Sequence, residues 1–93
     1  MFDHILTKIR DKILKKKYVM TLHAEEEMND DGLSIYDVEE IISSGTIKER
    51  QKDQRTAEWK YCIQGKTMSS HVGEVVVKLG LTGKVILITV YKD

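Results

Sequence analysis

The sequence predicts an α+β fold, in which two to three N-terminal helices pack on one face of a C-terminal antiparallel sheet of about four strands. Two patterns predict it: apolar residues recur every three or four positions in the first half of the chain, and every second position in the second half. With 93 residues and 41% apolar side chains, the chain has room for one core, and we expect a single domain over residues 1–93.

The first half contains the predicted helices. Residues 2–14 carry apolar side chains at helical spacing, and three lysines at 15–17 follow, where cations favour the negative end of the helix dipole. Residues 18–22 are rich in β-formers and predict a short strand or extended link. A second helix is expected over residues 23–31, ended by Gly32.

A third helix and the strands complete the prediction. Ser34 followed by Asp37 is a capping-box pattern that opens the helix, and Gly45 ends it. The predicted strands span residues 46–52, 57–64, 74–79 and 84–91.

Two of these strands have distinctive patterns. The first is polar and is expected at an edge, with Ile47, Glu49 and Gln51 on one side and the cations on the other. The last is almost continuously apolar, which predicts a central strand covered on both faces.

Charge is balanced overall but uneven along the chain. Lys plus Arg equals Asp plus Glu at 15 each, so net charge alone indicates neither a nucleic acid nor a membrane as partner. Residues 1–46 nevertheless sum to −4 and residues 47–93 to +4. This predicts an acidic side and a basic side, and a phosphate backbone would lie on the basic side. The alternative is that two solvated faces of the protein simply differ by a few charges.

Several function classes are excluded by what the sequence lacks. No apolar run is long enough to span a bilayer, and the N-terminus lacks the basic-then-apolar order of a secretion signal. A single cysteine, Cys62, excludes an internal disulfide and a multi-cysteine zinc site. We therefore expect a cytoplasmic protein with no cofactor, no metal and no membrane partner.

The basic half offers groups for RNA chemistry. Metal-free cleavage needs a base for the 2′-hydroxyl, an acid for the leaving oxygen and cations for the phosphate. Histidine side chains ordinarily titrate near neutrality, so either His23 or His71 suits the acid or base role. The other candidates are Arg50, Arg55, Lys60, Lys66, Lys78 and Tyr91.

Two pairs of strand residues allow alternative interpretations. If their strands are neighbours, Lys60 and Lys78 project from the same face, either to bind phosphate or simply to form a solvated face. Trp59 and Tyr61 either stack on nucleobases or pack under the helices.

Ordered segments along the chain carry a family resemblance, among them residues 61–66 and 74–78. Residues 21–28 read Thr-Leu-His-Ala-Glu-Glu-Glu-Met, residues 32–42 contain Gly-Leu-Ser and Asp-Val-Glu-Glu-Ile-Ile, and residues 85–91 read Val-Ile-Leu-Ile-Thr-Val-Tyr. Over roughly residues 18–91 the chain resembles a prokaryotic family of small domains of unknown function. Its members have a His-Ala-x-x-Arg-Met helix and a final Ile-Thr-Val-Tyr strand. Glu27 stands where the family usually has arginine.

The resemblance implies a function. It implies an MqsR-like or RelE-like toxin of a type II toxin–antitoxin pair, a metal-independent endoribonuclease acting on messenger RNA. The implied partners are RNA and a cognate antitoxin, often of a zinc-finger type, and a homodimer is left open. The alternatives are a non-catalytic RNA- or protein-binding module of the same fold, or an inactive member of the family.

The site residues follow from this hypothesis. The resemblance implies that His23, Lys78, Thr89 and Tyr91 border one site. The predicted catalytic residues are His23 as acid or base, Lys78 as a phosphate ligand, and Tyr91 as a second proton donor or stacking group. The predicted substrate-binding residues are Arg55, Lys60, Lys66 and Thr89.

Overall fold

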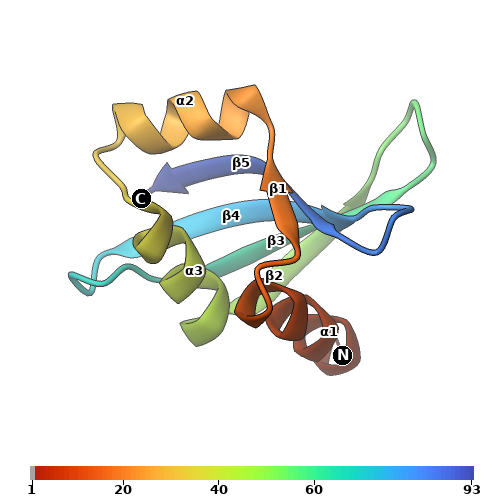
Figure 1. Cartoon of the computed structure of the whole chain (residues 1–93), viewed down its shortest axis with the longest axis horizontal. Coiled ribbons are helices and arrows are strands. Elements are labelled where there is room, and N and C mark those ends of the chain that lie inside the picture. The colour runs from red at the N-terminus through yellow and green to blue at the C-terminus, as the bar shows by residue number, and fades with distance from the viewer. Residues whose placement is uncertain (1) are drawn as a thin grey trace.

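The computed structural model describes residues 2–93, which form three helices and five strands (Figure 1). In chain order the elements are α1 (Asp3–Leu14), β1 (Tyr18–Met20), α2 (Leu22–Asp30), α3 (Ile35–Ser44), β2 (Thr46–Lys52), β3 (Trp59–Lys66), β4 (Val72–Leu79) and β5 (Val85–Lys92). The predicted α+β class, with helices before the main strands, is confirmed.

The strands form one open sheet in the order β1-β5-β4-β3-β2. Strands β2 to β5 are the predicted antiparallel meander. β1 adds a fifth strand, parallel to β5, with Tyr18 opposite Val85. The sheet is therefore mixed rather than purely antiparallel, because the link between α1 and α2 pairs with the last strand.

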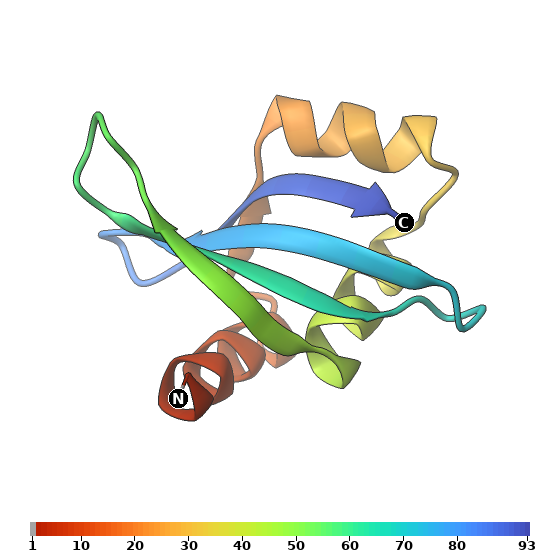
Figure 2. The ribbon, with the colours of Figure 1, turned by 180° about the vertical axis from the view of Figure 1, so that it is seen from behind.

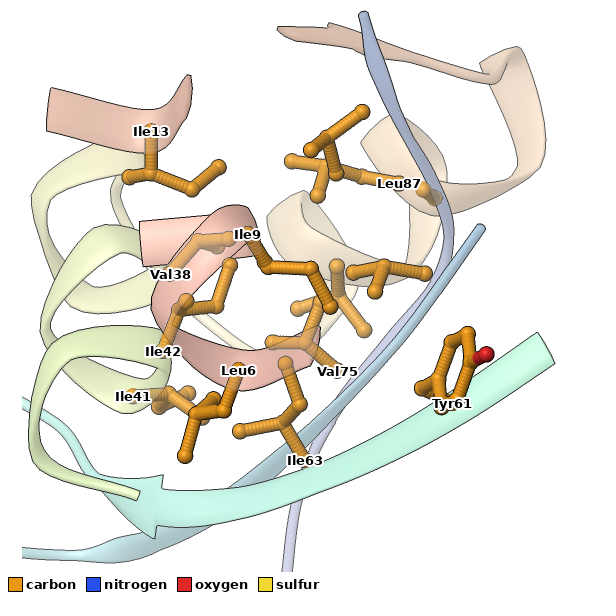
Figure 3. Packing of buried hydrophobic residues seen from close by; sticks show 14 of the residues in the cluster. Leu6, Ile9, Ile13, Val38, Ile41, Ile42, Tyr61, Ile63, Val75 and Leu87 are labelled. Carbon is orange, nitrogen blue, oxygen red and sulfur yellow. The ribbon is translucent and has the colours of Figure 1, made fainter. Parts of the chain in front are cut away.

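The core lies between the helices and one face of the sheet (Figures 1 and 3). Apolar residues at helical spacing on α1 and α3 meet every second residue of the strands, as the two periodicities require. The largest fully buried side chains are Ile9, Val38, Ile41, Ile42, Ile63, Val75, Val77, Val85, Leu87 and Val90.

α3 is fixed at both ends. Its capping box is present as predicted, since Ser34 Oγ accepts the Asp37 N–H at 3.3 Å and Asp37 accepts the Ser34 N–H at 2.9 Å. At the other end, Arg10 of α1 donates to the carbonyls of Ile42 and Gly45. These carbonyls have no partner within the helix, so Arg10 satisfies them and ties α1 to α3.

The prediction that the last strand is covered on both faces is wrong. The three helices cover one face of the sheet, and no helix in residues 2–93 covers the opposite face, which we call the open face (Figure 2). Val85 and Leu87 are fully buried on the helix side, whereas Ile86 and Ile88 are only half-buried. The apolar run of β5 thus leaves aliphatic side chains on a partly solvated surface. No helix in residues 2–93 is long and apolar enough to cross a membrane.

The predicted alternation of β2 is also wrong, because a β-bulge lies between Ile47 and Glu49. Ile47 pairs with Ile63 and Arg50 with Tyr61, and both partners are buried on the helix side. One extra residue in the strand reverses the sides that follow it. As a result the Arg50 side chain shares the helix side of the sheet with Ile47.

Candidate functional site

The β2–β3 hairpin and the β4–β5 turn project from the same end of the sheet (Figures 1 and 2). We call residues 50–60 and 78–84 the hairpin end. Its first segment carries four cationic residues against two acidic ones. Three of the predicted site residues, Arg55, Lys60 and Lys78, lie in the hairpin end, with Arg55 exposed in the turn after β2.

The structure makes Lys60 and Lys78 neighbours. The β3–β4 ladder ends at the pair of Tyr61 and Val77, and Lys60 and Lys78 are the residues directly beyond this pair on the two strands. Both lie on the open face, opposite in direction to the buried Tyr61 and Val77. The Lys78 Nζ lies 3.2 Å from a carboxylate oxygen of Glu58, whereas Lys60 has no ion pair within residues 2–93.

Trp59 and Tyr61 differ in their surroundings. Tyr61 is buried and packs edge-on against Phe2, with ring centroids 6.3 Å apart. Trp59 is 40% exposed, with the Arg50 guanidinium 4.0 Å and the Lys52 Nζ 5.8 Å from its ring centroid. Packing under the helices is therefore the role of Tyr61, while Trp59 presents an aromatic surface beside two cations.

A shallow depression of about 210 Å³ lies beside this tryptophan, lined by Glu58, Trp59, Tyr61 and Leu79. The Arg50 and Lys52 side chains have no carboxylate partner in the described part of the chain. An exposed ring with two cations beside it can stack on a nucleobase while the cations contact a phosphate.

His23 lies elsewhere, in the first turn of α2, beyond the Thr21 cap. Its imidazole is 66% exposed, and Nε2 lies 3.1 Å from Glu27 Oε1. Glu27 also accepts the backbone N–H of Val90 at 3.2 Å, so this residue is bound to β5 rather than simply exposed. α2 carries four carboxylates and neither lysine nor arginine, which makes the surface around His23 acidic.

Tyr91 and Thr89 lie on the open face of β5, opposite Glu74 and Val76 of β4. The Tyr91 hydroxyl donates to Glu74 Oε1 at 2.8 Å. This hydrogen bond, together with burial, raises the pKa of Tyr91 above its usual value. A phenol held in this way gives up its proton less readily.

Lys66 ends β3 and is exposed at the opposite end of the sheet from Arg55. β3 is eight residues long, so its two ends lie about 23 Å apart at the usual strand rise. His71 is exposed in the loop between β3 and β4, where its backbone N–H donates to Thr67.

The predicted catalytic residues do not contact one another. His23, Lys78 and Tyr91 each contact a different carboxylate, and no hydrogen bond or ion pair in residues 2–93 joins any two of them. The structure therefore groups the predicted phosphate ligands of the hairpin end and leaves His23 and Tyr91 apart from them.

Sequence analysis missed a buried carboxylate on the open face. Glu74 is 4% exposed and accepts hydrogen bonds from Cys62, Lys48, Gln64 and Tyr91. Burial opposes its ionisation, but the hydrogen bonds to its carboxylate, those from Cys62 and Tyr91 foremost, together outweigh burial and lower the pKa of Glu74 to about 2. The one feature of the sequence that could have indicated this site is the acidic residue at position 74, directly before three consecutive valines of β4.

The same contacts explain the chemistry of the cysteine. Burial, then the hydrogen bond to Glu74, raises the pKa of the Cys62 thiol to about 12. The thiol is protonated at neutral pH and is a poor nucleophile. Within the described chain, no three histidine, cysteine, aspartate or glutamate side chains are placed to hold a metal ion.

Comparison with known proteins identifies the family. The family model described as "Domain of unknown function (DUF4258)" matches residues 20–92. No curated protein and no solved structure matches the chain. The matched segment spans α2, α3 and all four strands of the meander. The chain therefore belongs to the DUF4258 family of domains of unknown function.

Proposed function

We propose that this domain binds single-stranded RNA through the hairpin end of its sheet. The observation that carries the proposal is the Trp59 side chain, 40% exposed and with a guanidinium 4.0 Å from its ring centroid. Aromatic rings beside cations bind single strands because every base has a face that can stack.

The charge distribution supports this location. Arg50, Lys52 and Lys60 have no ion pair in residues 2–93, so their charges are not neutralised by neighbouring carboxylates. The four carboxylates of α2 repel a polyanion from the other side of the molecule. The combined field favours a phosphate backbone at the hairpin end.

Fluorescence and salt dependence test the proposal. Trp59 is the chain's single tryptophan, so quenching of its emission by an unlabelled oligouridine reports stacking at this position. Replacement Trp59→Ala is expected to weaken binding, measured by anisotropy of labelled RNA, by about 1–3 kcal/mol. Wild-type protein that leaves the anisotropy unchanged, or a Trp59→Ala variant that binds equally well, overturns the proposal.

A charge-matched pair of variants locates the phosphate contacts. Arg50→Ala with Lys52→Ala is expected to reduce the slope of log K against log salt by about 1.4, since each phosphate contact on a single strand contributes about 0.7. The control, Lys15→Ala with Lys92→Ala, removes the same charge from exposed positions outside the hairpin end. Equal changes in both double variants would mean that the protein attracts RNA only by overall charge.

RNA cleavage at His23, as in a toxin-type endoribonuclease, is a second candidate function. It is favoured by one observation: an exposed imidazole whose Nε2 lies 3.1 Å from the fixed carboxylate of Glu27, which suits an acid or base. The acidic surface of α2 opposes RNA at this position, and for this reason we place cleavage second.

Expression from a tight promoter separates the two candidates. A toxin arrests growth, and His23→Ala relieves the arrest, whereas a binding module does neither. An adjacent antitoxin gene, particularly one of a zinc-finger type, would support the toxin candidate and supply its partner. Harmless expression together with intact RNA after incubation with the purified protein would exclude cleavage.

A further inference from the structure

We infer that the free edge of β2 is a docking site for an extended acidic segment of a partner protein, which adds to the sheet as a further strand. The two edges of the sheet differ. The edge opposite β2 is formed by the three-residue β1 and, beyond it, by the end of β5. At that end of β5, Glu27 accepts the N–H of Val90 at 3.2 Å and Asp31 accepts the N–H of Lys92 at 2.8 Å. β2 has β3 as its only strand neighbour, and in residues 2–93 no hydrogen bond outside that pairing reaches its backbone.

An edge strand of this kind is a template for another chain. Alternate backbone N–H and C=O groups of β2 point away from β3, and a peptide that adds there gains main-chain hydrogen bonds. All four residues after the bulge, Glu49 to Lys52, are exposed. The edge is therefore accessible over a stretch as long as a short bound strand.

The side chains of β2 determine which strand fits. Arg50 and Lys52 are two residues apart, so they project on the same side of the sheet, and neither has an ion pair within the described residues. An added strand presents every second side chain on that side. Two carboxylates at positions i and i+2 would therefore face both cations.

A second copy of the chain fits less well. Antiparallel pairing of two β2 strands would place Arg50 and Lys52 against the same cations of the other copy, and like charges directly opposite destabilise a ladder. The bulge and the cations thus protect the edge from self-association. The same charges that reject a copy select an acidic strand.

Docking at this edge would also control RNA binding, a part of the inference that rests on the proposed function. Arg50 and Lys52 are the cations that flank Trp59. An acidic strand that pairs with them neutralises the phosphate contacts of the hairpin end. The bound segment and RNA are then expected to compete.

A synthetic seven-residue peptide in which glutamate alternates with valine serves as the probe. Its binding is followed by Trp59 fluorescence and by amide hydrogen exchange of the full chain. We expect slower exchange at alternate amides of β2 and no change in β5. Two control peptides are matched to it, one with a central proline and one with lysine in place of glutamate.

The expected preferences are specific. The proline peptide loses a main-chain donor and is expected to bind at least about tenfold more weakly. The lysine peptide is also expected to bind about tenfold more weakly, as the loss of two exposed ion pairs implies. The double variant Arg50→Glu with Lys52→Glu should prefer the lysine peptide.

Each adverse outcome has a distinct meaning. Unchanged exchange in β2, or equal binding of the proline peptide, overturns strand addition. If the peptide protects β2 but the protein fails to bind oligouridine, the docking site stands and the proposed function fails. If oligouridine binds and no peptide does, the proposed function stands and the docking site fails.

Discussion

The carboxylate of Glu27 accepts the backbone N–H of Val90 at 3.2 Å and so attaches helix α2 to the outer edge of β5. β1 ends at Met20, whose partner is Leu87, so the later residues of β5 pair with β4 on one side and have no strand on the β1 side. A side chain of α2 thus takes the place of a strand partner. It satisfies a backbone donor that would otherwise lack a protein acceptor.

Loss of this acceptor should destabilise the protein. Glu27→Ala leaves the half-buried N–H of Val90 unpaired, and we expect the free energy of unfolding to fall by about 1–2 kcal/mol, measured by urea denaturation. Glu27→Gln retains an acceptor oxygen and should restore most of the loss. Glu26→Ala, at an exposed neighbouring position, is the control. An equal loss in Glu26→Ala would show that helix charge, not this bond, is responsible.

A second prediction concerns the contact between α3 and β3. A side-chain carbon built at Gly65 would overlap the Ile41 carbonyl oxygen and lie 2.9 Å from the Gly45 Cα. Both obstacles are backbone atoms, which cannot rotate away. Gly65→Ala should therefore destabilise the protein by about 2–4 kcal/mol in thermal or urea unfolding. At Gly32 there is open space for a side chain, but φ is +68°, so Gly32→Ala measures the cost of backbone strain alone. We expect it to lose less stability than Gly65→Ala.

Local patterns in the sequence predict most of this fold. The capping box at Ser34 and the helical spacing in α1 are signals within a few residues, so they predict the helices. The parallel pairing of Tyr18 with Val85 joins distant segments, and no local pattern encodes it. The bulge after Ile47 also depends on register with β3, so simple alternation placed Arg50 on the wrong side.

The site was predictable to a similar extent. Period-two alternation suffices to place Lys60 and Lys78 on one face, and the observed register makes them neighbours. Their carboxylate contacts depend on tertiary packing. The bond from Tyr91 to Glu74 and the ion pair between Lys78 and Glu58 link residues whose pairing no spacing rule fixes.

The buried carboxylate of Glu74 predicts a specific acid sensitivity. Its pKa is lowered from 4.5 to about 2 in the folded protein, so the folded state favours the ionised form. The stabilisation is complete above about pH 4.5, the unfolded value, and is lost as the pH falls toward 2. A shift of this size corresponds to about 3 kcal/mol.

The measurement compares wild type with Glu74→Gln by urea unfolding at pH 7, 4 and 3. We expect the wild type to lose more stability than the variant between pH 4 and 3, because the amide does not titrate. Asp37 and Glu39 also have lowered pKa values and contribute equally to both proteins. Identical pH profiles would show that Glu74 is not ionised preferentially in the folded state.

The last prediction concerns the reactivity of Cys62. Burial raises the pKa of its thiol to about 12, and the hydrogen bond at 3.0 Å to Glu74 adds to this effect. Because the thiolate is the reactive form, alkylation by iodoacetamide at pH 8 should be much slower than for an exposed cysteine. The control is a cysteine introduced by Ser69→Cys in a Cys62→Ser background, at an exposed loop position. Alkylation is measured by mass spectrometry for the folded chain in buffer and for the unfolded chain in urea. Cys62 should react quickly only in the unfolded chain. Rapid alkylation of Cys62 in buffer would mean that the thiol is accessible and ionised, and would make it a candidate nucleophile.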